Sequence, residues 1–490
     1  MKARFATALS ALALAGCAAG PPPEIATPAP VLPDGYLYAP SQAEQATIAA
    51  LLPNDDPAFE QLASAALAQN PSLAEALARI DQTRANARRA GAERLPSVGA
   101  EASVTGQRLN PNQFGGALPP TVRLDAEQVS YGANLTARWD PDLFGVLRAQ
   151  ERAATLRIGA AEAGAAAVRL ALLAEIAAAV IDFRTLAARA EELQSDLQAA
   201  EELARLAGVR EDAGIAPGFD RVRAEAQAAA SRSRLEALES ERVRLLGQLV
   251  TLTAASGNEV RAALALPQSA ADLPPAPATA PSLLLVNRPD ILQAASELAA
   301  ADADLLAVAR QRFPNISLSA AVGVLAFGLG DLFDEDSLVG TLAASIAAPL
   351  LDFGRIKAEI DGAAATEQVA LQRYRRAVFQ ALGDAEAGYG LVAAADREAA
   401  AAAAQRNSAQ RAARLANTRY EAGLADFLTV LEARRTADAS GEQAAAAIGR
   451  ARRARVLLWQ ALGGEPVEPQ QSSPSSLGEG DQPQAGGGAR

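Results

Sequence analysis

The side chains that most often carry out chemistry in proteins are scarce in this chain. Its 490 residues include one cysteine, Cys17, one methionine and no histidine. A single cysteine cannot form an internal disulfide or a thiolate metal cluster, and without histidine there is no imidazole base and no histidine metal site. No nucleophile motif is present either. We therefore expect neither an enzyme nor a bound cofactor or metal.

Cys17 has a specific context at the N-terminus. A positively charged start and an apolar stretch from residue 5 to residue 15 form the pattern of a signal peptide, too short to span a membrane as a helix. The preceding Leu14-Ala15-Gly16 resembles the bacterial lipobox, which implies removal of residues 1–16 and lipidation of Cys17 by fatty acids such as palmitate. Ala18 is not the aspartate that favours inner-membrane retention, so the resemblance implies an outer-membrane lipoprotein. A free cysteine behind an ordinary signal peptide is the alternative.

Charge and hydropathy exclude two further classes. A net charge of −12 leaves no broad basic surface, so we expect no nucleic-acid partner. The most apolar later stretch, 160–183, is interrupted by Glu162, Arg169 and Glu175, so we expect no membrane-spanning helix. If the mature chain crosses a membrane, strands must do so.

The mature chain contains an internal duplication, the most informative feature of the sequence. Four segments recur in the same order: Arg94-Leu95-Pro96-Ser97-Val98 as Arg312-Phe313-Pro314-Asn315-Ile316, Asp142-Leu143-Phe144-Gly145 as Leu351-Asp352-Phe353-Gly354, Ala204-Arg205-Leu206-Ala207 as Ala413-Arg414-Leu415-Ala416, and Glu211-Asp212-Ala213-Gly214-Ile215 as Tyr420-Glu421-Ala422-Gly423-Leu424. Because the offset between the matches is nearly constant, we predict two copies of one unit, 70–256 and 288–464. Each copy comprises a short helix, a β-hairpin and two long helices.

Alternating residues predict the β-hairpins. The short helices, expected over about 71–94 and 289–312, end before Pro96 and Pro314, because the residue before proline avoids helical backbone. Apolar and polar residues then alternate, which predicts strands at about 97–106, 128–139, 315–325 and 338–348. One apolar and one polar face suits a tilted transmembrane strand around a wet lumen, although a half-buried strand in a soluble sheet shows the same pattern. Four strands cannot close a barrel and open edges are not tolerated in lipid, so at least two chains must combine, and three would give twelve strands.

The expected helix lengths indicate a wall of uniform height. Long helices over about 145–209 and 354–419 would each reach nearly 100 Å. Helices over about 219–256 and 427–463, each added to the short helix of its own copy, reach nearly the same length. We therefore predict that one long helix alternates with two stacked shorter ones. A simple coiled coil would explain the abundant alanine but neither the hairpins nor the matching lengths.

Three segments lie outside the two copies. The residues after Cys17 are rich in proline and alanine, and we predict a lipidated N-terminal tether over 17–69. The proline-rich segment 257–287 is expected to be a linker that wraps around the outside of the body. The Ser/Gly/Pro/Gln-rich residues 465–490 are expected to be a disordered tail.

Taken together, these features resemble the TolC-like outer membrane factor family, in particular the lipidated branch that serves resistance-nodulation-division efflux pumps. The most specific motifs are the paired Arg-x-Pro strand entries, Leu351–Arg355, Arg419–Leu424 and Asp426–Ala433. The resemblance implies a mainly α fold with transmembrane β structure: a homotrimer whose twelve-stranded outer-membrane β-barrel continues into a twelve-helix periplasmic α-barrel. It also implies a periplasmic adaptor protein and an inner-membrane efflux transporter as partners. The chain would then be the passive, gated exit duct for drugs or other small molecules in multidrug resistance.

The resemblance places a gate at the two helix turns, 208–219 and 419–427, which would form the periplasmic tip. Glu432 stands where the family usually has an aspartate that faces the closed tunnel, and it departs from that pattern by one methylene. Three copies would make a ring of carboxylates that favours cations. Thr429 on the same helix face and Leu428 as an apolar plug would complete the gate. A solvated helix charge is the alternative for Glu432.

The same turns carry two further pairs of candidate residues. Tyr420 and Asp220 match positions that link neighbouring chains in the closed state, so we predict a hydrogen bond from the Tyr420 hydroxyl to the Asp220 carboxylate that breaks on opening. A packed aromatic side chain and a favourable charge at a helix start are the alternative. Gly214 and Gly423 have the character of turn glycines with positive φ, in the region that meets the adaptor.

The second copy carries Tyr420 and Glu432 where the first carries Glu211 and Arg223, so we expect the moving part of the gate in the second turn.

Two other functions would show many of the same sequence features. A type I protein-secretion channel would have the same fold and trimer, although the lipobox favours efflux. A structural periplasmic coiled-coil lipoprotein would have no channel and no conductance.

Overall fold

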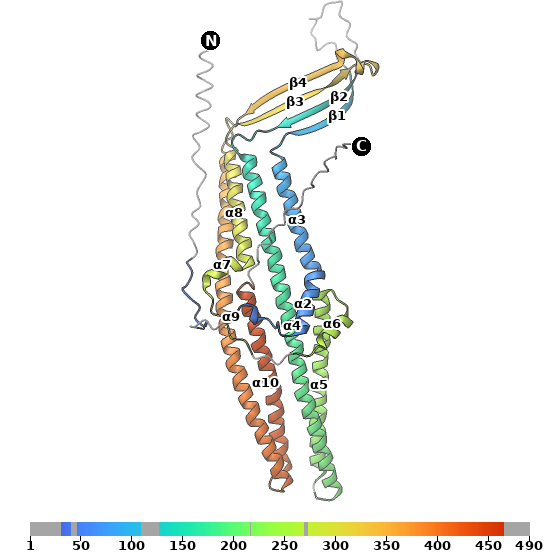
Figure 1. The fold of residues 1–490 in the computed structure, drawn as a ribbon, viewed down its shortest axis with the longest axis vertical. Coiled ribbons are helices and arrows are strands. Elements are labelled where there is room, and N and C mark those ends of the chain that lie inside the picture. The colour runs from blue at the N-terminus through green and yellow to red at the C-terminus, as the bar shows by residue number, and fades with distance from the viewer. Residues whose placement is uncertain (1–30, 41–46, 109–126, 216, 269–272, 465–490) are drawn as a thin grey trace, which may run out of the picture.

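A computed structural model describes residues 31–40, 47–108, 127–215, 217–268 and 273–464 of the chain. It is an elongated molecule in which a four-stranded sheet lies at one end and helices run to two turns at the other (Figure 1). We call the end formed by these two turns, residues 208–219 and 419–427, the tip. The predicted lipidation site Cys17 and the predicted tail 465–490 lie outside the described residues.

The sheet contains one hairpin from each copy. Its strands are β1 (Ser97–Arg108), β2 (Glu127–Trp139), β3 (Asn315–Ala326) and β4 (Leu338–Ala347). Their order is β1-β2-β3-β4 and every neighbouring pair is antiparallel. The pairing of β2 with β3, which sets Leu135 opposite Val322, joins the two copies. Each strand begins within one residue of the position expected from the alternation.

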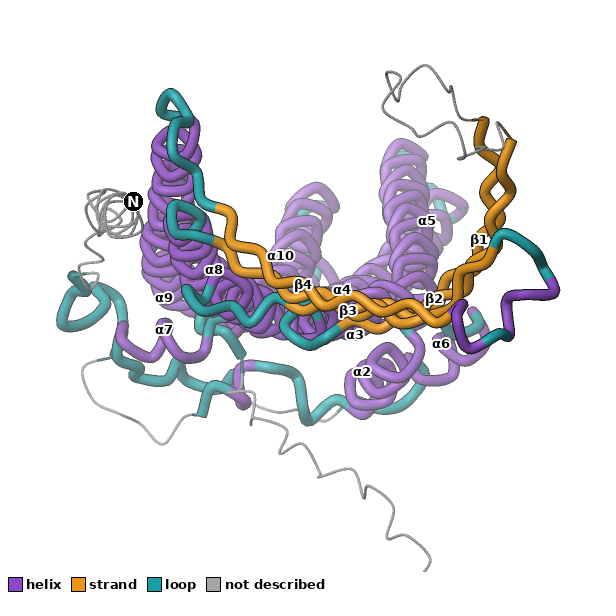
Figure 2. The backbone as a smooth tube through the Cα atoms, turned by 90° about the horizontal axis from the view of Figure 1, so that it is seen from above, coloured by secondary structure: helices purple, strands orange, loops and turns teal. Residues whose placement is uncertain are grey.

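The sheet is curved and largely uncovered. Figure 2 shows it as an arc above the helices. Apolar side chains are exposed along the outer strands, including Val98 at 73 % and Leu342 at 86 %. In the described chain, β1 and β4 each have a strand neighbour on one side only. Because an exposed apolar sheet with open edges is a poor solution for a single chain in water, this sheet has the form of one part of a larger closed structure.

Two long helices set the height of the body. They are α4 (Val146–Asp212) and α9 (Arg355–Glu421), each of 67 residues, or about 100 Å at the usual helical rise. The shorter α3 (Pro71–Ala92) and α5 (Gly218–Thr253) stack end to end along α4 (Figure 1). In the second copy, α8 (Pro289–Arg310) and α10 (Phe427–Ala461) do the same along α9. Helix α4 also contacts α8 and α10, so the two copies share one helical layer.

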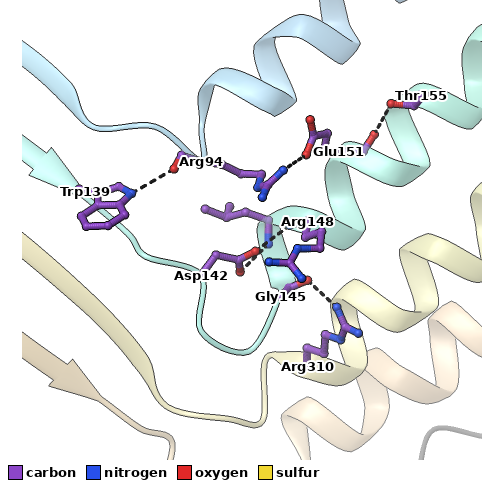
Figure 3. A network of polar contacts seen from close by, with 9 residues as sticks. Arg94, Trp139, Asp142, Gly145, Arg148, Glu151, Thr155 and Arg310 are labelled. Carbon is purple, nitrogen blue, oxygen red and sulfur yellow. Dashed lines mark hydrogen bonds and ion pairs between the residues drawn. The ribbon is translucent and has the colours of Figure 1, made fainter.

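Polar contacts fix the junction between sheet and helices (Figure 3). Asp142 accepts hydrogen bonds from backbone amides in the first turn of α4, and Gly145 with φ +76° begins the helix. Arg310 at the end of α8 donates to the Gly145 carbonyl oxygen at 2.7 Å. On the other side, the indole nitrogen of Trp139 donates to the Arg94 carbonyl oxygen at 3.1 Å. These contacts orient the hairpins on the helices where the chain changes from strand to helix.

The predicted tether is shorter than expected, because its last part belongs to the folded body. Residues Pro57–Gln69 form helix α2, whose N-cap Asp56 accepts a hydrogen bond from the Ala58 amide. Asp56 is almost completely buried and pairs with Arg184 of α4 at 2.9 Å. Phe59 is buried in the main core. The Asp-Pro helix start was visible in the sequence, but only packing against α4 shows that this segment is part of the body.

The segment between the copies lies against the helices. It includes the short helices α6 (Gly257–Leu264) and α7 (Leu284–Asn287). The Tyr389 hydroxyl of α9 donates to the Pro277 carbonyl oxygen at 2.8 Å, and Arg455 of α10 donates to the Pro274 carbonyl oxygen at 2.7 Å. The ring of Tyr36, near the N-terminal end of the described chain, packs in a tilted arrangement against that of Tyr389, with centroids 5.1 Å apart. The linker and the N-terminal segment therefore meet on the second copy.

Helix α4 corrects the expectation that no later segment is apolar enough to cross a membrane. By length and composition, one 18-residue window of this helix is apolar enough to cross a membrane. Inside the structure, 44 % of that window is buried. Its buried side chains include Ile176, Ala177 and Val180, each fully enclosed in the main core. In the structure this segment is the centre of the helical body, where its apolar faces contact other helices of the same chain.

Candidate functional site

The described residues of the two turns close in the same way. Gly214 and Gly423 adopt left-handed φ values of +71° and +72°. Just beyond each glycine, a backbone amide closes the turn onto a carbonyl oxygen five residues earlier: Ile215 to Arg210 at 2.9 Å, and Leu424 to Arg419 at 2.7 Å. This closure satisfies the last carbonyls of a helix and requires a residue that tolerates positive φ. The predicted turn glycines therefore lie where a glycine is needed.

The second turn has a hydrophobic interior. The rings of Tyr420 and Phe427 meet edge to face with centroids 6.0 Å apart, and both side chains are buried. Val430 and Leu431 of α10 complete this cluster, together with Leu203 and Ala207 of α4 and Ala224 of α5. The cluster therefore joins the α9–α10 hairpin to the α4–α5 hairpin close to the tip.

The first turn is held by charge. Glu211 at the end of α4 accepts a hydrogen bond from Arg221 of α5 at 2.7 Å, and both side chains are partly exposed. Hydrogen bonding and the charge of Glu211 raise the pKa of the Arg221 guanidinium. Phe219 is 60 % exposed, with the guanidinium of Arg223 over its ring at 4.2 Å. This turn thus leaves an apolar ring at the surface.

The three predicted gate residues share one exposed face of α10. Leu428 is 41 % exposed, and Thr429 and Glu432 are also exposed. Their spacing of three and four residues places them side by side on the helix. Asp426 caps this helix by accepting a hydrogen bond from the Thr429 amide at 2.7 Å, and its hydrogen bonds to Thr429 lower its pKa. Among the described residues no ion pair involves the Glu432 carboxylate, and its side chain is exposed.

The structure does not bring the predicted link together within one chain. Tyr420 lies on the buried side of α9, where the guanidinium of Arg210 stands over its ring at 4.3 Å. Asp220 lies in the first turn of α5 and is only partly buried. Among the described residues no hydrogen bond joins these two side chains. The predicted bond links neighbouring chains, so it stays a prediction.

A buried polar cluster escaped the sequence analysis. The Ser231 hydroxyl of α5 donates a hydrogen bond to the carboxylate of Asp196 of α4, and both side chains are buried. Asp438 of α10 lies beside them with a completely buried oxygen, Oδ2. Burial, followed by hydrogen bonding and repulsion from Asp196, raises the pKa of Asp438 to about 8. The available signal was Asp196 on the apolar face of α4, next to Leu193 and Leu197, but its neighbour on α10 could not be identified from sequence.

The described residues contain no group of three or more histidine, cysteine or carboxylate side chains arranged to hold a metal ion. The described part of the tip combines an ion pair, an apolar cluster and two glycine turns.

Comparisons of this chain with known proteins agree on one family. A family model described as outer membrane efflux protein matches residues 62–258 and 280–464, which spans both copies. The pyoverdine export outer membrane protein OpmQ of Pseudomonas aeruginosa is 33 % identical over 411 residues, 83 % of this chain and 85 % of that protein. The outer membrane protein OprJ of the same organism is 30 % identical over 443 residues, 87 % of this chain and 88 % of that protein.

Solved channels share the fold. The outer-membrane channel OprN superposes with a TM-score of 0.81 at 26 % identity, covering 91 % of this chain and 99 % of that one. The outer membrane protein VceC of Vibrio cholerae superposes with a TM-score of 0.74 at 28 % identity, covering 83 % and 96 %. The resemblance to TolC-like outer membrane factors is thereby confirmed. The chain belongs to the outer membrane efflux protein family, whose members are outer-membrane channels that extend into the periplasm and act as efflux ducts, not as enzymes.

Proposed function

We propose that three copies of this chain form a gated exit duct that passively conducts small molecules from the periplasm to the exterior. The observation that carries the proposal is the curved four-stranded sheet with an unpaired edge on β1 and another on β4. Pairing β4 of one copy with β1 of the next would close twelve strands without a free edge, as lipid requires. The helical layer below would close in the same way into a tunnel.

The partners proposed are a periplasmic adaptor protein and an inner-membrane efflux transporter, which would supply the energy. The tip offers exposed apolar side chains for an adaptor: Ile215 at 77 %, Leu424 at 69 % and Phe219 at 60 %. They surround the glycine turns at Gly214 and Gly423. Exposed apolar residues clustered at one end of a molecule are typical of a protein interface.

The cargo class proposed is small organic molecules. One relative is named for pyoverdine export, and another, TtgI of Pseudomonas putida, for a toluene efflux pump. Lipidation of Cys17, after removal of residues 1–16, would anchor each copy in outer-membrane lipid beside its strands. Glu432, Thr429 and Leu428 would then face the tunnel near its tip, and Tyr420 with Asp220 would link adjacent chains when it is shut.

Reconstitution of the purified lipidated protein tests the proposal directly. We expect a trimer that resists dissociation in mild detergent, conducts ions in planar bilayers and prefers cations. Glu432→Gln should lower the cation preference, because it removes the charge from the proposed ring. Glu398→Gln is the matched control, since Glu398 is an exposed carboxylate of α9 paired with Arg450 at 2.6 Å, away from the tip.

A monomeric protein without conductance would overturn the duct and favour a structural coiled-coil lipoprotein. Conductance with equal loss of cation preference in both variants would remove Glu432 from the gate. Deletion of the gene in its own host separates efflux from protein secretion: we expect increased sensitivity to small toxic molecules and an unchanged set of secreted proteins.

A further inference from the structure

The buried polar cluster lies in the contact between the two long hairpins. Asp196 belongs to α4 and Asp438 to α10, and these two helices pack against each other along the lower half of the body. Asp196 is 4 % exposed, and Oδ2 of Asp438 is buried without a donor from the described chain. Apolar clusters lie on both sides: the main core towards the sheet, and the Tyr420 cluster towards the tip. The pair therefore lies between two apolar clusters in this contact.

The surroundings of the pair do not neutralise it. In the described chain no ion pair involves either aspartate. Glu192 of α4, Ser231 of α5 and Arg434 of α10 act on the pair directly. Helix α9 contributes through these neighbours: its Arg406 donates a hydrogen bond to Glu192, and its Asn417 accepts one from Arg434. Arg406 pairs with Glu192 at 2.5 Å, and the more distant Arg189 of α4 pairs with Glu442 of α10. Arg434 remains the nearest source of positive charge and only partly offsets burial and the two neighbouring acids.

Asp196 is buried and Asp438 is partly buried with its Oδ2 enclosed, so these two neighbouring carboxylates cannot both be ionised at low cost. A proton between them forms a hydrogen bond, whereas removing it leaves two like charges in a medium of low polarity. The pKa of Asp438 accordingly rises from 3.8 to about 8, mainly through burial and then through Asp196. The packed seam therefore binds a proton that separated helices in water would release. Its stability is fully present below the unfolded pKa of 3.8 and is lost progressively as pH rises from there through about 8.

We propose that Asp196 and Asp438 share a proton that clamps the α4–α5 hairpin to the α9–α10 hairpin, and that loss of this proton loosens the tip end of the duct. The inference rests on the proposed channel function only for its consequence, the opening of the tip. The clamp itself is a property of the single chain, because α4, α5 and α10 all belong to one copy. In a trimer the three clamps would respond to pH together.

The test compares the full-length protein with Asp438→Asn and Asp196→Asn at pH values from 6 to 9. Asparagine keeps the shape and can donate a hydrogen bond but cannot ionise. Asp361→Asn is the matched control, because Asp361 is an exposed aspartate of α9 with only a surface pairing to Lys357 at 4.0 Å. The readouts are the heat stability of the helical signal in detergent and the ratio of open to closed time in planar bilayers.

For the wild-type protein and Asp361→Asn we expect heat stability to fall as pH rises. We also expect the ratio of open to closed time to rise, by up to about tenfold per pH unit for each proton released. For Asp438→Asn and Asp196→Asn we expect both readouts to be nearly independent of pH and to resemble the acidic wild type. A wild-type slope in either variant, or no slope in the wild type, would overturn the clamp. So would failure of both asparagine variants to fold, because they imitate the protonated pair. Stability that depends on pH in a protein without conductance would contradict the proposed duct but support the clamp.

Discussion

The two turns of the tip share a backbone but differ in what fills them. Both close through a glycine with the same φ and the same hydrogen bond. At corresponding positions the first turn has charged or small residues and the second has apolar ones: Glu211 against Tyr420, Gly218 against Phe427, and Arg221 against Val430. A duplicated unit has therefore kept its turn geometry while its interior has diverged.

The difference has an energetic consequence. The Glu211–Arg221 pair is about two-fifths exposed, and such pairs contribute only about 0–1 kcal/mol. Burial of an aromatic side chain such as Phe427 contributes about 1.5–3 kcal/mol, with more from ring–ring contact. The tip end of the α9–α10 helical hairpin is thus more strongly stabilised than the tip end of the α4–α5 helical hairpin. If the moving part of the gate lies there, as the sequence predicts, its motion would carry this hairpin as a unit rather than unwind its turn.

Replacing one phenylalanine in each turn gives the largest expected effect. Phe427→Ala should destabilise the tip end of the α9–α10 hairpin by about 3–5 kcal/mol, because it empties a buried site. Phe219→Ala should cost less than about 1 kcal/mol, because this ring is mostly in water. Hydrogen exchange of the amides near the tip measures both, in α9 and α10 for Phe427→Ala and in α4 and α5 for Phe219→Ala. Equal protection losses in the two variants would contradict the difference in packing.

Substituting the turn glycines tests the shared backbone. Gly214→Ala and Gly423→Ala should each cost about 1–2 kcal/mol, because alanine is strained at positive φ. Neither position has another atom within 4 Å of an added Cβ, so the backbone alone determines the cost. We expect the two losses, measured by heat unfolding, to agree within about 0.5 kcal/mol. A much larger loss at Gly423 would show that the second turn uses its glycine for more than closure.

The smallest expected effect on stability comes from removing one hydroxyl. Tyr420→Phe keeps the buried ring, so unfolding should change by less than about 1 kcal/mol. If the predicted bond to Asp220 of a neighbouring chain exists, ion leak through closed channels should nevertheless increase. Tyr389→Phe is the control, because that hydroxyl is bonded to Thr279 and Pro277 far from the tip. Unchanged leak in Tyr420→Phe would leave Tyr420 as a packing residue only.

Elements specified by local chemistry were predictable. The strand starts follow Pro96 and Pro314, and the turns follow Gly214 and Gly423, because proline and glycine act on the backbone where they stand. Helix α2 was missed for the opposite reason. Its Asp56 cap is local, but its place in the body depends on Arg184, which lies more than a hundred residues along the chain.

By itself, the sequence determined the duplication, the periodicities and lengths of the strands and helices, and the need for more than one chain to close the sheet. Only the tertiary structure decided which faces meet. Periodicity shows that Asp196 lies on an apolar helix face and Asp438 on another helix, but it cannot show that the two carboxyls touch. Their shared environment, and the pH dependence inferred from it, arise where two helices distant in sequence pack together. Side-chain chemistry there depends on neighbours and on exclusion of water, neither of which a single segment encodes.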